Sequence, residues 1–325
     1  MNIDLSNSEV RSFYHLLQEN LIDNRSPIGQ KHELAFVITL FTISILTSYG
    51  QSSINKTRRN MVRNYDDLCI SLHKPIKSCI SRVQLSRILS DFDYESFIEI
   101  VNEYWDSNDD HNKTESDWYA VDGKELRGSI DSNTGFTRGL SIVLSVNHRS
   151  KLQRILGYYD ATKESEKVVV QENILKLPEG TKVTLDALHN SEPLLTSIEA
   201  NNCIYLTQIK SNQKFLYEDL KHIGDYLTPM TTIETLDKGH GRIDNRLYEV
   251  YLVNTECLDK RWSESGLCRM VKVTRDSYNV KKEKTSHEIR YYITNYNECD
   301  KEIVEAVRNH WSVEIINRIR DVNFG

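Results

Sequence analysis

The sequence predicts an α/β protein in which an all-helical N-terminal domain precedes a domain built on a mixed β-sheet. Apolar residues recur at helical spacing through the first hundred positions, and a strongly polar stretch follows them. Beyond that stretch, short β-branched runs alternate with helical segments, as in a mixed sheet covered by helices. With 325 residues, of which 39% are hydrophobic, the chain is long enough for two domains with buried cores.

Residues 1–105 are predicted to form the helical domain. Val10, Phe13 and Leu17 follow a helical period, and the 13-residue apolar run 34–46 predicts a buried helix. That run is shorter than the ~20 residues that a transmembrane helix needs. Ser81 is a plausible N-cap for a helix that follows it. Residues 106–117 contain only polar residues and are predicted to be an acidic linker.

Residues 118–325 are predicted to form the α/β domain. Its first part reads as three antiparallel strands followed by alternating helices and strands: strands 118–121, 140–146, 152–159, 182–186 and 203–209, and helices 165–177, 192–200 and 212–226. A strand-rich insertion is expected at about 231–296, with strands near 247–253, 267–273 and 289–294. The last segment, 301–322, has one apolar stripe at helical spacing and is predicted to be a helix.

Charge is distributed unevenly along the chain. The formal net charge is −6, yet the segment 56–87 carries eight basic residues against two acidic ones. The segment 91–117 carries ten acidic residues and one lysine. Because salt screens each charge within roughly 8–10 Å, a local basic patch can bind phosphates on an acidic protein. Ordinary solvated helix faces are the alternative interpretation.

Cysteine usage and the N-terminal sequence indicate where in the cell the protein is located. The six cysteines are scattered without a CxxC pair, which favours reduced thiols over a disulfide framework or a zinc site. The N-terminus lacks the order of charged, apolar and small residues that marks a signal peptide. We therefore expect a soluble, cytoplasmic protein that does not insert into membranes.

Three carboxylates stand out by their position. Asp122 follows a predicted strand, Asp186 ends another, and Glu314 lies beside the apolar stripe of the last helix. Each also has an ordinary explanation: an Asp-Gly hairpin turn, a helix cap and a solvated helix face. Together, acids at the ends of neighbouring strands and on a helix across the sheet would converge. Such a cluster needs a hard divalent cation, and two Mg²⁺ ions ~3.5–4 Å apart can support phosphodiester displacement.

Further polar side chains would suit a phosphate-handling site. Lys210 and Gln213 follow a predicted strand, and the glycine-rich stretch that begins at Lys238 places His240, Arg242 and Arg246 on or beside a turn. A basic surface hairpin is the alternative for these clusters. His310 and Arg318 lie one helical turn on either side of Glu314, where they could orient its carboxylate, contact DNA phosphate or form an i,i+4 ion pair.

Five sequence blocks occur in one order: VDGKELRGS at 121–129, TLDALH at 184–189, QIKSNQ at 208–213, HGRIDNR at 240–246 and NHWSVE at 309–314. Together they resemble the signature blocks of the H-repeat-associated, ISAs-type transposases of bacterial insertion sequences. The resemblance covers nearly the whole chain, including the N-terminal helical segment. After the glutamate, however, this chain is one residue shorter than the family pattern and lacks its His-Trp pair.

The resemblance implies an RNase H-like catalytic domain, and its DDE triad falls on Asp122, Asp186 and Glu314. It implies binding of Mg²⁺ or Mn²⁺, with two ions, and cleavage and strand transfer of double-stranded DNA at element ends and target sites. The DNA or phosphate contacts would come from the polar side chains named above together with N-terminal basic residues, Arg58, Arg59, Lys77 and Arg82.

Two other functions remain open at the level of sequence. Because the chain stops soon after Glu314, a truncated remnant that binds DNA without cutting it is one of them. A general metal-dependent nuclease with the same sheet is the other. A homodimer on DNA is compatible with transposition, although the sequence does not specify an oligomeric state.

Overall fold

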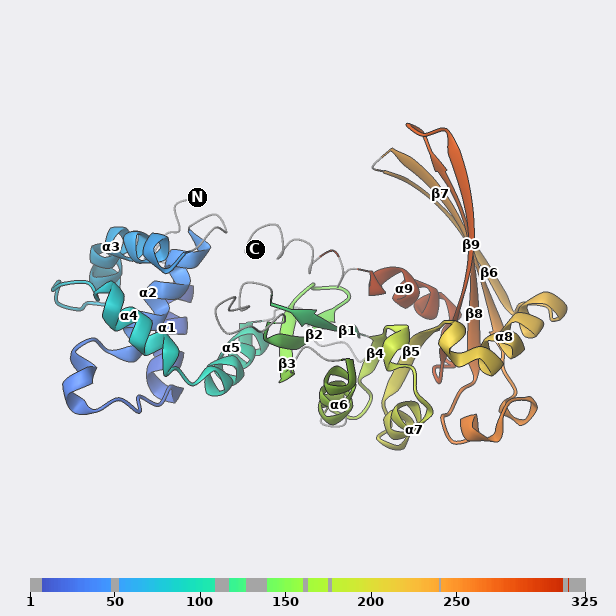
Figure 1. Ribbon diagram of the computed structural model, residues 1–325, viewed down its shortest axis with the longest axis horizontal. Helices are drawn as coiled ribbons and strands as arrows, with labels where there is room; N and C mark the ends of the chain where they lie inside the picture. Colours follow the sequence, from blue (N-terminus) through green and yellow to red (C-terminus); the bar gives the residue numbers. More distant parts are fainter. Residues whose placement is uncertain are drawn as a thin grey trace. The chain divides into compact units, whose positions relative to one another are not determined.

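The structure, a computed structural model, describes residues 8–47, 53–108, 117–126, 139–159, 163–174, 177–239, 241–311 and 315. The chain divides into two compact units (Figure 1). The described residues of the first unit lie between 8 and 108, and those of the second lie between 117 and 315.

The first unit is helical, as the sequence predicts. Its described elements are α1 (Ser8–Asn20), η1 (Pro27–Lys31), α2 (Leu34–Leu46), α3 (Ile54–Ser71), α4 (Arg82–Ser90) and α5 (Tyr94–Asn108). The apolar helix α2 buries nine of its thirteen residues, and the core of the unit forms around it. Burial of these aliphatic side chains is the main term that stabilises the unit.

Helix ends in this unit follow ordinary capping chemistry. Ser81 caps α4 through a reciprocal capping box with Gln84, so the predicted cap is confirmed. At the other end of the unit, α5 continues through Asn108. The expected linker at 106–117 is therefore wrong at its start, because residues 106–108 are helical. Polar composition alone does not distinguish the end of a helix from a loop. Residues 109–116 lie outside the described part.

The second unit is built on one mixed sheet. Its strands are β1 (Trp118–Glu125), β2 (Ser141–Asn147), β3 (Gln153–Tyr159), β4 (Lys182–Leu185), β5 (Ile204–Ile209), β6 (Thr231–Gly239), β7 (Arg242–Leu252), β8 (Arg269–Asn279) and β9 (Lys284–Thr294). Within the described residues the strand order is β3-β2-β1-β4-β5-β9-β8-β7-β6. The predicted α/β class and the three antiparallel strands β1 to β3 are confirmed.

Strand β1 runs parallel to β4, and β4 runs parallel to β5. β1 extends to Glu125, four residues past its predicted end. Within it, Asp122 pairs with Leu144 of β2 and Gly123 pairs with Val143. The alternative interpretation of Asp122-Gly123 as a hairpin turn is therefore wrong, because both residues belong to a strand.

The strands β6 to β9 continue the central sheet. β9 pairs antiparallel with β5, so the predicted insertion extends the same sheet that carries β1 and β4 (Figure 1). The sequence predicted three of these strands, too short, and missed β6. Charged and exposed residues along β6 and the outer halves of β8 and β9 hide their β-character from an apolar-run criterion.

Helices cover both faces of this sheet. α6 (Lys163–Ile174), α7 (Glu192–Ala200) and α8 (Lys214–Tyr226) contribute to one core with the inward side chains of β4 and β5. α9 (Asp300–His310) packs in a separate core with β7, β8 and β9. Short 3-10 turns, η3 (Ala187–His189), η4 (Ser211–Gln213), η5 (Thr255–Cys257) and η6 (Lys260–Trp262), complete the unit. Across the described residues, no helix combines the length and apolarity that a bilayer crossing requires.

Candidate active site

Two aspartates occupy equivalent positions along neighbouring parallel strands. Val121 of β1 pairs with Leu185 of β4, and the next residue in each strand direction is an aspartate, Asp122 and Asp186. Adjacent strands lie about 4.8 Å apart, so the two carboxylates begin from neighbouring backbone positions. The two strands are neighbours, as expected, and Asp186 follows the end of β4. Asp122 does not follow its strand as expected, because β1 continues through Glu125.

Asp122 is in an environment that disfavours its charged form. Its pKa is raised to about 6, first because burial removes water from the carboxylate and then because Glu166 and Asp186 are nearby negative charges. Near neutral pH this carboxyl group therefore responds strongly to any positive charge placed beside it. Such perturbation by burial and like charge is typical of functional carboxylates.

Asp186 is held in its charged form. Burial alone would raise its pKa, but the backbone N–H of Ala187 and the ammonium of Lys210 lower it below the ordinary value. The Ala187 N–H donates to Oδ1 over 2.6 Å, and Nζ of Lys210 lies 3.2 Å from the same oxygen. Asp186 is thus also the N-cap of η3, which was its ordinary explanation. Lys210 was predicted to face the same site as the aspartates, and its ammonium contacts Asp186.

A third acid, Glu166 of α6, approaches from the other face of the sheet. Its Oε2 accepts a hydrogen bond of 2.9 Å from the Tyr159 hydroxyl, and its Oε1 lies 3.1 Å from Nε2 of buried His189. These partners lower its pKa, although burial alone would raise it. A Cβ atom on Gly123 would lie 2.4 Å from the Glu166 carboxyl carbon, so glycine is what leaves room for this acid. Sequence reasoning missed Glu166; the glycine inside a strand was the available signal.

A threonine and two histidines lie behind Asp186. Thr184 precedes Asp186 by two residues on β4, and its Oγ1 is 2.8 Å from Nδ1 of His310 and 3.1 Å from Nε2 of His148. Burial lowers the pKa of His148 to about 3 and that of His310 to about 4. Both imidazoles are therefore neutral near pH 7. His310 bonds to strand β4 through Nδ1, and its predicted contact with phosphate or a carboxylate stays a prediction.

Glu314 lies outside the described residues, as do Arg318 and His240, so their predicted roles stay predictions. The chain on either side of Glu314 is partly described. The backbone N–H of Ile315 donates to the Trp311 carbonyl over 3.2 Å, which is the i→i−4 bond of an α-helix.

Arg242 and Arg246 line a different cavity, of about 320 Å³, between the outer strands and the end of α9. Arg246 pairs with Asp237 and Asp244 at 2.5 and 3.0 Å. Among the described residues, five arginines line this cavity: Arg242, Arg246, Arg275, Arg290 and Arg308. Only two aspartates line it with them, and Glu288 pairs with Arg290. The cavity therefore has an excess of positive charge, beside the exposed ring of Trp311.

Two predicted contact residues have structural partners. Gln213 donates to the backbone carbonyl of Asn190 over 3.0 Å, and the Arg58 side chain donates to the carbonyls of Cys79 and Ile80. Arg58 therefore fastens the segment between α3 and α4. The other three N-terminal basic residues, Arg59, Lys77 and Arg82, are exposed.

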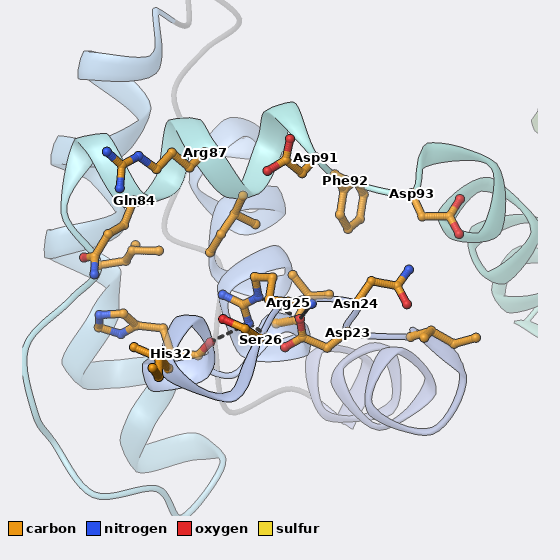
Figure 2. Close-up of a pocket in the computed structure, with 15 residues that line it drawn as sticks. Asp23, Asn24, Arg25, Ser26, His32, Gln84, Arg87, Asp91, Phe92 and Asp93 are labelled. Carbon is orange, nitrogen blue, oxygen red and sulfur yellow. Dashed lines mark hydrogen bonds and ion pairs between the residues drawn. The ribbon is translucent and has the colours of Figure 1, made fainter.

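The first unit has its own cavity of about 530 Å³, shown in Figure 2. Arg25 lies in it, paired with Asp23 at 2.6 Å and bonded to the His32 carbonyl. Arg87 lines it too, but Asp91 and Asp93 lie on the same side of the cavity. Because three aspartates line this cavity with the two arginines, it does not favour an anionic ligand.

The donor set near β1 and β4 suits a hard cation. Carboxylate oxygens are the ligands that Mg²⁺ and Mn²⁺ prefer, and Asp122 and Asp186 offer them from adjacent strands. In the part of the chain that the structure describes, no group of three or more His, Cys, Asp and Glu side chains is arranged as a metal site. A third ligand would have to come from outside that part.

Comparison with protein families gives one match over residues 114–325, to the family described as "Transposase DDE domain". Among curated proteins, "Putative transposase YncI" of Escherichia coli O157:H7 is 26% identical over 87% of this chain and 73% of its own length. "H repeat-associated putative transposase YhhI" of Escherichia coli K12 is 25% identical over 90% of this chain and 77% of its own length. The sequence resemblance to this family is confirmed.

Proposed function

Because this chain belongs to the transposase DDE domain family, we propose that it cleaves DNA phosphodiester bonds at the ends of an insertion sequence and joins those ends to target DNA. The observation that carries the proposal is the placement of Asp122 and Asp186 at the same level of two neighbouring parallel strands. The family match supports the class of reaction, and this juxtaposition supports the assignment of the reaction to this part of the chain.

We also propose that the catalytic domain is RNase H-like. The order β3-β2-β1-β4-β5, with β2 antiparallel to its neighbours and β1, β4 and β5 parallel, supports this assignment. In such sheets, side chains that follow the carboxyl ends of central strands meet in one crevice. That rule applies to Asp186, which follows β4, and to Lys210, which follows β5. Asp122 lies within β1, one position beyond the residue that pairs with the last residue of β4.

Asp122 and Asp186 would hold the divalent cations, with Glu314 completing the set. Glu314 comes four residues after His310, and four residues of chain span at most about 14 Å. His310 contacts Thr184 on β4, two residues before Asp186, and this contact supports the assignment of Glu314. When bound, Mg²⁺ or Mn²⁺ supplies Lewis acidity toward phosphodiester oxygens and lowers the pKa of a water nucleophile.

The chain's own cations would bind and orient the DNA. Lys210 stands beside Asp186, where its ammonium can contact a phosphate oxygen at the reacting centre. The arginine-lined cavity, with Arg242 and Arg246, would hold a phosphate further along the strand. Water and then a 3′-hydroxyl serve as nucleophiles, so no covalent protein–DNA intermediate forms.

The test is nicking of a supercoiled plasmid that carries this gene with the DNA flanking it on both sides. Asp122→Asn and Asp186→Asn each should reduce Mn²⁺-dependent nicking at least 100-fold, because each removes one charged ligand. Asp259→Asn is the matched control, since Asp259 is exposed and Asn also caps η6. That control should nick at the wild-type rate.

Two outcomes would contradict the proposal. A wild-type protein that binds this plasmid without metal-dependent nicking would be a DNA-binding remnant. Equal nicking of a plasmid without the flanking DNA would indicate a general nuclease. Wild-type nicking by Asp122→Asn would remove the site assignment itself.

A further inference from the structure

Helix α9 is fastened to strand β4 at two points. Near its start, Glu302 accepts hydrogen bonds from Lys182 of β4 and from Trp118 and Tyr296, at 2.8, 2.8 and 2.6 Å. At its last residue, His310 bonds to Thr184 of the same strand over 2.8 Å. Two attachments along one helix fix both its axial position and its rotation about its axis.

The second attachment depends on one hydroxyl group. Thr184 is 1% exposed, and its Oγ1 lies within hydrogen-bond distance of both His310 and His148. A hydroxyl has one proton to donate and lone pairs to accept with, so it can donate to one neutral imidazole and accept from the other. Valine has the same shape as threonine but can do neither.

Helix α9 runs in the same direction as strand β4. The two residues on β4, Lys182 and Thr184, contact α9 in the same order as their partners Glu302 and His310 occur along the helix. The helix therefore advances in the direction of β4, toward the end where Asp186 follows. The chain that leaves His310 starts beside that end, and it leads to Glu314 four residues later.

We propose that Thr184 is a positioning residue: its shared hydrogen bonds hold the end of α9, at His310, against the edge of the sheet where Asp122 and Asp186 lie. This inference rests on the proposed function, because it concerns the sheet edge that carries the two aspartates of the proposed site. It adds a hydrogen-bonded group that touches neither DNA nor metal. His148 is the support that orients the hydroxyl from the opposite side.

The experiment compares Thr184→Val, Thr184→Ser and a matched control, Thr207→Val, in the full chain. Thr207 is equally buried on the adjacent strand β5, and its hydroxyl has no hydrogen-bond partner within the described structure. Two readouts are used: nicking of the plasmid with flanking DNA in Mn²⁺, and hydrogen exchange along α9. We expect Thr184→Val to lose nicking at least 10-fold and to exchange faster over 306–311 than over 300–305.

Thr184→Ser keeps the hydroxyl and should stay within threefold of wild type in both readouts, as should Thr207→Val. Wild-type nicking and exchange in Thr184→Val would overturn the inference. So would equal loss in Thr184→Ser, because the methyl group would then be the important part. If the wild-type protein does not nick at all, the proposed function fails, and the hydrogen exchange pattern alone decides whether the attachment exists.

Discussion

Gly123 illustrates how a single absent side chain shapes the site. It follows Asp122 in β1, and the carboxylate of Glu166 occupies the space that a Cβ atom would need. That carboxylate is held by Tyr159 and His189, so it cannot simply swing away. The glycine thereby allows an acid from α6 to influence the charge of Asp122.

Gly123→Ala should therefore displace Glu166 and destabilise the protein by about 1 to 3 kcal/mol, as other overpacked sites do. Urea denaturation gives the free energy of unfolding. Gly239→Ala is the control, because nothing lies within 4 Å of a Cβ atom there. If Gly123→Ala is as stable as that control, the close packing of Glu166 against β1 is not real.

His148 gives the fold a dependence on acid. Its pKa is about 3 in the folded chain because burial disfavours the imidazolium, against about 6.5 when it is exposed in the unfolded chain. Above pH 6.5 both states are neutral and the full stability is present. As the pH falls from 6.5 toward 3, His148 becomes protonated in the unfolded state but stays neutral in the folded state. The free energy of unfolding therefore decreases.

We expect the free energy of unfolding to fall more steeply between pH 6 and 5 in wild type than in His148→Gln. The difference is about 1.4 kcal/mol per pH unit, which corresponds to one proton. Urea denaturation at several pH values measures it. His222→Gln, at an exposed histidine, should leave the slope unchanged, and an identical slope in His148→Gln would contradict the assignment.

Some residues of the candidate site could be predicted from the sequence, and others could not. Asp122 and Asp186 could be found because each stands at a strand position that the local pattern reveals. Lys210 could be found for the same reason. Glu166, Thr184 and His148 could not, because their contacts join segments far apart in sequence and no local periodicity records them.

Among the elements, α9 depends most on polar contacts with the sheet. Lys182 is 8% exposed and Glu302 is 20% exposed at their side chains, and burial makes each costly without the other. The two hydrogen bonds from Trp118 and Tyr296 satisfy the remaining lone pairs of Glu302. An apolar replacement of one partner leaves the other charge without its counterion.

Lys182→Met and Glu302→Leu should each lower the free energy of unfolding by about 2 to 3 kcal/mol, and the double variant by less than their sum. Urea denaturation of the four proteins forms a double-mutant cycle. The exposed pair Asp259–Arg261 serves as comparison and should show a coupling below about 1 kcal/mol. Additive effects at Lys182 and Glu302 would show that the pair does not fasten α9.

Element prediction succeeded where apolar periodicity was strong and failed where it was weak. Helix α7 was predicted with its observed bounds, and Leu194, Leu195 and Ile198 form its buried apolar face. β6 was missed because its residues alternate between half-buried and exposed, with charges on the strand. The pairing of β9 with β5 was also missed, because strand order depends on contacts between distant segments.

For the whole molecule, the main question is how a chain of net charge −6 meets a polyanion. The exposed basic residues of the helical unit, Arg59, Lys77 and Arg82, offer one answer, because only charges within a screening length of the phosphates contribute. Each phosphate neutralised by such a side chain releases condensed counterions. The logarithm of the binding constant then falls with the logarithm of salt by about 0.9 per contact.

If these three residues contact duplex DNA, replacing all three with glutamine should reduce the salt slope by about 2 to 3 and weaken binding at low salt. Fluorescence anisotropy of a labelled duplex from the flanking DNA, titrated at several NaCl concentrations, measures both. The matched control replaces Lys214, Lys221 and Lys260, which are exposed on the second unit and lose the same charge. Equal slopes in the two triple variants would mean that net charge alone governs binding, and the helical unit would then have no specific role in contacting DNA.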